Sequence, residues 1–356
     1  MKALKLEHIT FGYRKGKTLF KNLSIQLNQP VGKGLVIGLM GASGSGKSTI
    51  LKLILGIEKN YQGKISITPE NQVISYVPQE AVLFEHLSPF ENAEYFNRIS
   101  NYKSKFNHEL FNEVAKTLQI EDVLKKATSV NEISGGQRQK ISLLRAMSIK
   151  PDILLLDEPL TGLDEEVKDQ FLQTLATFIQ RFNLMVIYVT HHRKEAEFIS
   201  DVILYLQKEN DVDAVSEAKQ MNVRDFFNNP PTVSALNAIK EIRVNTLQFR
   251  QNENGSIEPI EVTQFLNDSK IHFMSFKENV IQFSNNSGFA FEVAAETGTY
   301  TLLKLKGTHI VLTIDNDQYK SNSQEKFISL SGYISLYGNR GQFIGATKIK
   351  NNQIVS

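Results

Sequence analysis

The order of apolar and polar positions predicts strands alternating with helices over the first 200 residues. Residues 3–10 and 22–27 alternate apolar and polar side chains, which is typical of half-buried strands. Residues 35–40, 153–156 and 184–190 are continuous apolar runs, the pattern of strands buried on both faces. Strands are expected at 3–10, 22–27, 35–40, 64–68, 73–77, 153–156 and 184–190. The pattern favours an α/β fold with parallel strands at its centre.

Between these strands, apolar residues recur at helical spacing, which predicts helices. We expect a helix after Ser48, a mainly helical stretch from Pro89 to about Leu124, a helix opened by Ser134, and a helix over about 165–182. In the second of these, Phe106, Leu110, Phe111, Val114 and Leu118 should share one side.

The pattern changes after residue 207. Residues 208–222 are polar and charged and predict a hinge or short helix, Pro230-Pro231 breaks any helix, and 233–242 predicts one more helical face. From about 246 the chain predicts strand after strand, which indicates a small all-β barrel or sandwich. The expected domains are 1–207, with a helical subdomain at about 86–150, then a linker and helix over 208–245 and a β domain over 246–356.

The composition of the chain excludes several classes of protein. The chain of 356 residues is long enough for two cores, and it contains no cysteine, which excludes disulfide scaffolds and thiolate sites. A net charge of +2 gives no general attraction to nucleic acid or anionic membranes. The start resembles no signal peptide, and no apolar run reaches the ~18 residues that a membrane span needs. We expect a soluble, cytoplasmic protein.

The main candidate for chemistry is the stretch GASGSGKST, which follows a buried strand and opens a helix. It matches a loop whose backbone N–H groups surround phosphates, with a lysine as point charge and a serine hydroxyl for Mg²⁺. A chance match in a Gly/Ser-rich turn is disfavoured by the strand and helix on either side. The predicted phosphate-binding residues are Gly41, Ala42, Ser43, Gly44, Ser45, Gly46, Lys47, Ser48 and Thr49.

Two carboxylates follow the buried strand at 153–156. The carboxyl end of such a strand is where ligands bind in α/β sheets, and Mg²⁺ with a water nucleophile would give Asp157 and Glu158 their partners. Asp157 is then the metal ligand, and Glu158 orients or deprotonates the water. For an isolated pair, a solvated strand-end acid pair would be the alternative.

Three further sites are open to two interpretations. Ser134-Gly135-Gly136-Gln137 is a second anion site at a helix start, which would imply a second phosphate site or one completed by another copy, or it is only a capping turn. Tyr13 is an adenine-stacking aromatic or an ordinary core or turn tyrosine. His191, followed by His192, reaches a γ-phosphate or lies on the surface, and no third ligand supports zinc.

In this order, the motifs resemble those of the ATP-binding subunit of ATP-binding-cassette (ABC) transporters over residues 1 to about 207. The resemblance implies a P-loop NTPase cassette with a helical subdomain, ATP and Mg²⁺ as ligands, and ATP hydrolysis. Residues 41–49 match the Walker A loop, and Gln79 matches the Gln that senses Mg²⁺ and faces the membrane subunits. The other matches are Tyr13 for adenine stacking, Ser134–Gln137 for the signature motif, Asp157 and Glu158 for Walker B and the catalytic glutamate, Asp164 for the D-loop, and His191 for the switch histidine. By this resemblance Lys47, Gln79, Glu158 and His191 are catalytic, and Ser48, Gln79 and Asp157 bind the metal.

The sequence departs from the family pattern at four positions without losing a catalytic group. Ile133 replaces Leu, Thr161-Gly162 replace Ser-Ala, and His192 replaces a frequent Asp. In similar proteins two cassettes face head to tail, and the signature of one closes on the ATP of the other. The resemblance therefore implies a homodimer.

The C-terminal part is similar to the OB/TOBE-like regulatory domain of importer cassettes, on residues 226–245 and 301–314. The molybdate importer subunit is the most similar type, because one compact β domain follows the cassette. A spacer or dimerisation domain without a ligand is the open alternative.

The resemblance implies the peripheral ATPase of an importer on the cytoplasmic face of the membrane, with permease subunits and, indirectly, a solute-binding protein as partners. The alternative is an ABC-type ATPase that serves nucleic acid or ribosomes. The chain shows no long heptad insertion, no second cassette and no cysteines for zinc modules, and no nucleic acid partner is expected.

Overall fold

The chain forms two compact units, Met1–Arg224 and Asp225–Ser356, and each is described by itself. The computed structural model describes residues 2–13, 17–208, 214–228, 230–232, 235, 245–251, 257–259, 271–276, 281–284, 288–296, 300–306, 311–315, 320, 327–330, 332–337, 343–350 and 353–355. The helix expected over 233–242 lies almost wholly outside these residues.

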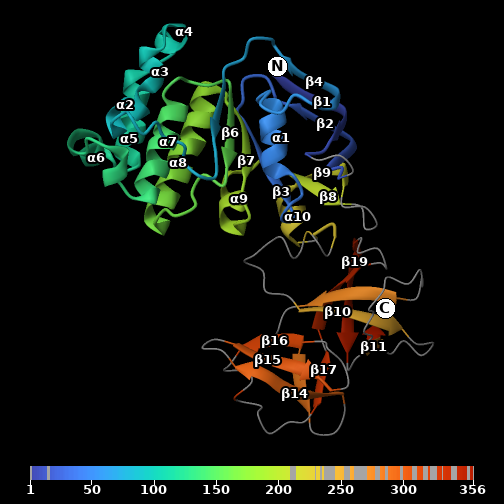
Figure 1. The fold of residues 1–356 in the computed structure, drawn as a ribbon. Coiled ribbons are helices and arrows are strands. Elements are labelled where there is room, and N and C mark those ends of the chain that lie inside the picture. Colours follow the sequence, from blue (N-terminus) through green and yellow to red (C-terminus); the bar gives the residue numbers. More distant parts are fainter. Residues whose placement is uncertain are drawn as a thin grey trace. The chain divides into compact units, whose positions relative to one another are not determined.

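The first unit is built on one nine-stranded sheet in the order β4-β1-β2-β9-β8-β3-β7-β6-β5 (Figure 1). Its strands are β1 (Ala3–Phe11), β2 (Phe20–Asn28), β3 (Leu35–Gly41), β4 (Gln62–Thr68), β5 (Ile74–Val77), β6 (Ile153–Asp157), β7 (Met185–Val189), β8 (Val202–Lys208) and β9 (Val215–Asn222). The strands β8, β3, β7, β6 and β5 pair in parallel, whereas β1 pairs antiparallel with β2 and β4. Each parallel strand thus ends at the same edge of the sheet.

Helices cover the sheet. They are α1 (Lys47–Ile54), α2 (Pro89–Ala93), α3 (Tyr95–Arg98), α4 (Ser100–Lys103), α5 (His108–Thr117), α6 (Glu121–Lys126), α7 (Gly135–Met147), α8 (Glu165–Phe182) and α9 (Arg193–Ile199). A further helix, α10 (Val223–Asn228), has most of its residues in the second unit. Figure 1 shows α2 to α6 gathered beside α7 and α8, at the end of the sheet away from β1, β2 and β4. The first unit is therefore an α/β fold in which helices pack against a mixed sheet.

The parallel strands are buried on both faces, as their continuous apolar runs predict. In β6, Leu154 and Leu156 pack into the core under α5, α7 and α8, whereas Ile153 and Leu155 pack into the core that contains α1. In β7, Val186 and Tyr188 pack into the same core as Leu154 and Leu156. A stretch of strand whose residues are all apolar therefore contributes to the cores on both faces of the sheet. The residue that follows this stretch lies at the edge of the sheet.

One expectation was wrong. Residues 208–222 were expected to form a hinge or short helix, but Val215–Asn222 forms β9, which pairs antiparallel with β8. Within this strand only Val215 is buried, so the strand does not show the alternation of apolar and polar residues that marks a half-buried strand. Backbone pairing at this place in the sheet determines the strand, and a pattern of side chains could not reveal it.

The amino edge of the sheet is held by polar side chains that bind the main chain. Asp201 Oδ2 accepts from Val36 N at 2.8 Å, and Asp152 Oδ2 accepts from Val73 N at 2.9 Å. Lys2 Nζ donates to Asp152 O at 3.1 Å. These groups fix where β3 and β5 begin.

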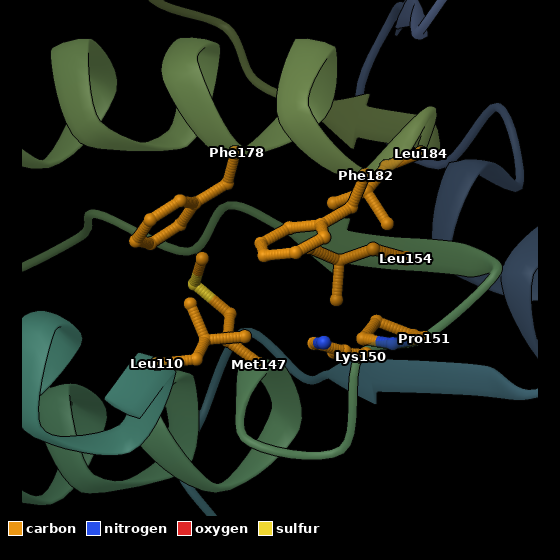
Figure 2. Close-up of a pocket in the computed structure, with 8 residues that line it drawn as sticks. All are labelled: Leu110, Met147, Lys150, Pro151, Leu154, Phe178, Phe182 and Leu184. Carbon is orange, nitrogen blue, oxygen red and sulfur yellow. The ribbon is translucent and has the colours of Figure 1, made fainter. Parts of the chain in front are cut away.

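An apolar cleft lies where α5, α7 and α8 meet the start of β6 (Figure 2). It is lined by Leu110, Met147, Lys150, Pro151, Leu154, Phe178, Phe182 and Leu184. Lys150 Nζ lies 5.1 Å from the centre of the Phe182 ring, so the one charged side chain of the lining sits over an aromatic face. The cleft lies at the opposite end of β6 from Asp157.

The second unit contains strands in two antiparallel sheets, β11-β10-β12-β18-β19-β20 and β13-β17-β14-β15-β16. The strands are β10 (Asn245–Gln251), β11 (Ile257–Pro259), β12 (Ile271–Phe276), β13 (Ile281–Ser284), β14 (Phe289–Glu296), β15 (Tyr300–Leu305), β16 (Val311–Asp315), β17 (Phe327–Leu330), β18 (Gly332–Tyr337), β19 (Phe343–Lys350) and β20 (Gln353–Val355). Buried apolar side chains of both sheets, such as Phe249 and Leu303, belong to one core. The likeness of this unit to an OB/TOBE-like domain stays a prediction.

Candidate functional site

The loop between β3 and α1 can hold its shape only with glycines at two positions. A Cβ on Gly41 would lie 2.5 Å from Ser45 Oγ, and Gly46 combines φ +89° with a Cβ position 2.5 Å from Phe20 Cζ. Left-handed φ together with a blocked Cβ excludes other residue types at Gly46. The loop therefore turns tightly into the start of α1, with its backbone close to any anion bound there.

Two side chains of this loop are suited to a phosphate chain. Lys47 Nζ donates to Gly41 O at 3.0 Å and to Ala42 O at 3.2 Å, which holds the ammonium at the mouth of the loop. Ser45 Oγ is buried and has no hydrogen-bond partner among the described residues. A buried hydroxyl without a partner is costly, so a ligand oxygen at the loop would satisfy it.

Tyr13 lies beside the first turn of α1. Its hydroxyl is 3.1 Å from Thr49 Oγ1, and its ring meets Phe11 edge-on with the centroids 4.9 Å apart. The side chain is nonetheless 57% exposed. An anchored aromatic ring with an exposed surface next to the phosphate loop fits a place where a base could stack.

Asp157 ends β6 and is only 3% exposed. Burial raises the pKa of its carboxyl, and a hydrogen bond from Ser48 opposes this rise. Tyr76 Oη donates to Asp157 Oδ2 at 3.4 Å, and burial together with the charge of Asp157 raises the pKa of Tyr76 well above its usual range. A buried carboxylate next to a serine hydroxyl at the phosphate loop is a donor set that fits Mg²⁺.

Glu158 is held between two side chains from neighbouring segments. Gln79 Nε2 donates to Glu158 Oε2 at 3.3 Å, and His191 Nδ1 lies 3.1 Å from Glu158 Oε1. Glu158 also has φ +45°, an uncommon conformation for a residue with a Cβ, and its N–H donates to Val189 O at 3.0 Å. Strained backbone of this kind is often found at functional sites.

A buried network supports the turn that carries His191. Glu195 Oε2 accepts from Tyr188 Oη at 2.9 Å and from Thr190 Oγ1 at 2.8 Å, and Thr190 Oγ1 accepts from His192 N at 3.0 Å. Burial and the charge of Glu195 raise the pKa of Tyr188 far above its usual value. Sequence reasoning missed Glu195, whose only signal was an acid four positions after a candidate histidine.

The helix start at Ser134 is a capping turn, one of the two interpretations that the sequence left open, and its role as an anion site stays a prediction. Ser134 Oγ accepts from Gln137 N at 3.2 Å, and Gln137 Oε1 accepts from Ser134 N at 2.9 Å, which is a capping box. Ser134 and Gly135 are exposed, so the helix start also faces outward. Gly136 packs against the loop that precedes α8, as shown by the 3.0 Å between a Cβ built on Gly136 and Gly162 O.

Asp164 lies at the start of α8 without capping it through its side chain. Its charge acts on Lys140 of α7, whose pKa burial lowers. The 161–164 loop and the start of α7 therefore border the same surface.

The structure thus brings Tyr13, the loop 41–49, Gln79, Asp157–Glu158 and His191 to the carboxyl edge of the parallel strands. A nucleoside triphosphate would extend along this edge from Tyr13 past Lys47 to Glu158. Beyond Glu195, sequence reasoning also missed Tyr76 and the buried Gln139 of α7, because each is a single polar residue inside a regular element.

Comparison with known proteins identifies the family of the chain. The model of the family described as ABC transporter matches residues 20–161. The Fe(3+) ions import ATP-binding protein FbpC of Photobacterium profundum is 31% identical over 256 residues, which cover 68% of this chain and 69% of that protein. The chain belongs to the ABC transporter family. It is an ABC ATPase cassette.

Other members of the ABC transporter family extend the match. FbpC of Vibrio cholerae is 32% identical over 57% of this chain, and the alignment spans only 58% of that protein. The sn-glycerol-3-phosphate import ATP-binding protein UgpC of Psychromonas ingrahamii is 28% identical over 94% of this chain and 88% of its own length. An ATP-binding cassette solved as a dimer in a post-hydrolysis state with ADP and Pi is 28% identical, with a TM-score of 0.51 over 62% of this chain and 99% of that one. Among the described residues of this family member, no helix is long and apolar enough to cross a membrane.

Proposed function

We propose that the chain is the ATP-hydrolysing subunit of an importer and works as a head-to-tail homodimer beneath separate membrane subunits. The names of its relatives support import, since those from Vibrio, Photobacterium and Psychromonas are all import ATP-binding proteins. The Psychromonas relative matches 94% of the chain, so the support is not limited to the cassette.

The observation that carries the proposal is the setting of Glu158. Its carboxyl lies between the Gln79 amide and the His191 ring, at the edge where the phosphate loop ends. In this role Glu158 accepts a proton from the attacking water, while His191 and Gln79 keep the carboxyl aligned. Lys47 neutralises charge on the phosphates, and the loop N–H groups hold them in line.

The metal ligands in this proposal are Ser48, Asp157 and Gln79. Bound Mg²⁺ supplies positive charge against the phosphate oxygens. The buried Asp157 carboxyl supports this assignment, because burial raises its pKa and a bound cation would favour its ionised form.

The signature residues Ser134, Gly135, Gly136 and Gln137 and the D-loop residue Asp164 complete the nucleotide site of a second copy. Two features support this assignment. The Ser134 end of α7 is exposed, and it carries the backbone N–H groups that an anion needs. The related cassette in the solved structure is itself dimeric.

The cargo proposed for the complex is an oxyanion, with molybdate as first candidate. Its support is the one β unit that follows the cassette and a relative whose name includes sulfate/thiosulfate import. The C-terminal unit is proposed as OB/TOBE-like, either sensing a ligand or serving as a spacer. The complex would place this chain on the cytoplasmic face of the membrane, with permease subunits and an extracytoplasmic solute-binding protein.

The test is purification of the tagged full-length chain from detergent-extracted membranes, followed by ATPase assays with molybdate, sulfate, Fe(3+) and glycerol phosphate and their binding proteins. We expect integral membrane subunits to co-purify and one solute to stimulate hydrolysis. Recovery of only nucleic acid or ribosomes would contradict the importer proposal and favour the alternative.

A further inference from the structure

Gln139 is a buried polar residue on α7, five positions after Ser134, and only 3% of it is exposed. Its Nε2 donates to Pro78 O at 3.3 Å and to Pro159 O at 3.2 Å. Pro78 directly precedes Gln79, and Pro159 directly follows Glu158. One amide group therefore joins the two segments that carry these functional side chains.

The pairing of β5 with β6 explains why a single side chain can reach both segments. The two strands are parallel neighbours, with Val77 opposite Leu156, so the chain leaves the sheet at adjacent points. Beyond the last paired residues, the carbonyls of Pro78 and Pro159 no longer belong to the strand ladder and need another donor. The two hydrogens of the Gln139 amide satisfy both.

A second side chain of α7 fixes the same segment further along. Arg145 Nη2 donates to Val82 O at 2.7 Å, and its guanidinium lies 5.7 Å from the centre of the Phe84 ring. Gln139 and Arg145 thus hold the 78–84 segment at two points, and a displacement of α7 must carry Gln79 with it.

The start of the same helix is the exposed capping box at Ser134. Five residues of helix span only ~7.5 Å between Ser134 and Gln139. In the proposed dimer, this start closes on the nucleotide of the second copy. Gln139 is therefore placed between the partner's nucleotide and this chain's own Gln79 and Glu158.

We propose that Gln139 is a positioning residue, which links closure of the Ser134 end of α7 on the partner's ATP to alignment of Gln79 with Glu158 in its own chain. The proposal rests on the proposed function, since it requires ATP hydrolysis in a dimer. Gln139 acts through the main chain on either side of the two functional residues, so its loss should reduce turnover more than nucleotide binding.

The first variant is Gln139→Met, which keeps the length of the side chain and removes both donors. We expect kcat to fall about tenfold or more, because small misplacements of catalytic groups cost this much, while KM stays within about twofold. Gln139→Asn keeps two donors on a side chain one methylene shorter and should have an intermediate kcat. It also serves as the test variant if Gln139→Met does not fold.

The matched control is Gln29→Met at the amino edge of the sheet. Gln29 is also 3% exposed, and its Nε2 donates to Lys33 O at 2.7 Å and Asn183 O at 2.8 Å. Both substitutions remove an amide that donates to two backbone carbonyls, so we expect both variants to be less stable to heat and Gln29→Met to keep its kcat, assayed well below either unfolding temperature.

A second readout does not depend on turnover. In the Glu158→Gln background, we expect Gln139→Met to leave the ATP-dependent dimer on gel filtration intact, because the Ser134 helix start itself is unchanged. Loss of the dimer would overturn the positioning role, since Gln139 would then be needed to build the nucleotide interface.

The kinetic outcomes separate the two proposals. Equal kcat losses in Gln139→Met and Gln29→Met, or a normal kcat in Gln139→Met, would overturn the role of Gln139 while the wild-type rate upholds the ATPase. A wild-type chain that hydrolyses no ATP with Mg²⁺ would overturn the proposed function and, with it, the role of Gln139.

Discussion

The two edges of the parallel sheet use polar residues in different ways. At the amino edge, Asp152 and Asp201 accept from backbone N–H groups, and Gln29 donates to backbone carbonyls. At the carboxyl edge, Asp157 and Glu158 are held mainly by other side chains. Groups bound to the main chain fix strand ends, whereas groups bound to movable side chains can change partners when a ligand arrives.

Buried polar atoms without a partner among the described residues occur at both edges, with Ser45 Oγ at the carboxyl edge and Gln29 Oε1 and Ser200 Oγ at the amino edge. At the carboxyl edge, Glu158 also has positive φ, and strained backbone of this kind is often found where a protein binds or reacts. The comparison leads to a simple rule: substitutions at the amino edge should affect stability, and substitutions at the carboxyl edge should affect ATP chemistry.

The largest expected effect is that of Glu158→Gln on hydrolysis. Removing the proton acceptor should lower the kcat of phosphate release about 100- to 1,000-fold. ATP binding should persist, because the phosphate loop is intact. The control is Asp122→Asn on α6, an exposed acid paired with Lys126, which should keep the full rate. A Glu158→Gln variant that keeps more than about a tenth of the rate would show that another group accepts the proton.

Asp152→Ala should lower stability and leave the ATPase rate unchanged, which is the opposite of what we expect for Glu158→Gln. It removes a charged acceptor from Val73 N and should lower the free energy of unfolding by about 2 kcal/mol. The ATPase rate at a temperature well below the transition should not change. Urea unfolding and a phosphate-release assay on the same preparation check this, and a slow but equally stable variant would break the contrast between the edges.

Asp157→Asn should stabilise the chain while it abolishes Mg²⁺-dependent hydrolysis. Burial disfavours the ionised carboxyl, so a neutral side chain of the same shape should raise the free energy of unfolding. Thermal unfolding in EDTA measures this. A variant that is less stable than the wild type in EDTA would show that the carboxylate is needed for folding itself.

The smallest effect on ATP binding is expected for substitutions of Tyr13. Tyr13→Ala should raise the Kd for ATP about three- to tenfold, the usual value of one stacked aromatic contact. Tyr13→Phe should stay within about twofold, because the ring remains and only the Thr49 contact is lost. Equal losses in both variants would assign the effect to the hydroxyl and remove the stacking role. Titration with a fluorescent ATP analogue distinguishes these cases.

The sequence predicted the carboxyl edge better than the network that supports it. Continuous apolar runs reveal β6 and β7, and a motif reveals the loop 41–49, because both patterns are local. Gln139 and Glu195 gave no such signal, since a polar residue on a helix more often faces solvent. Their burial depends on which strands lie beside α7 and α9, and this is a property of the tertiary fold.

The misassigned strand β9 follows the same logic. Its side chains are polar along most of its length, and pairing with β8 decides its conformation. The positive φ of Glu158 was also hidden, because glutamate has no preference for that region. The sequence therefore predicted the residues that the structure brings together at the carboxyl edge, and the structure was needed for those that hold them in place.

The most direct test of the central claim is gel filtration of the full-length Glu158→Gln variant with and without ATP. The site as proposed is half of a composite site, so the variant should elute as a dimer with ATP and as a monomer without it. Adding Lys47→Ala should abolish the ATP-dependent shift. A Glu158→Gln variant that binds ATP and remains monomeric at saturating nucleotide would contradict the account, because Ser134 would then have no second copy to serve.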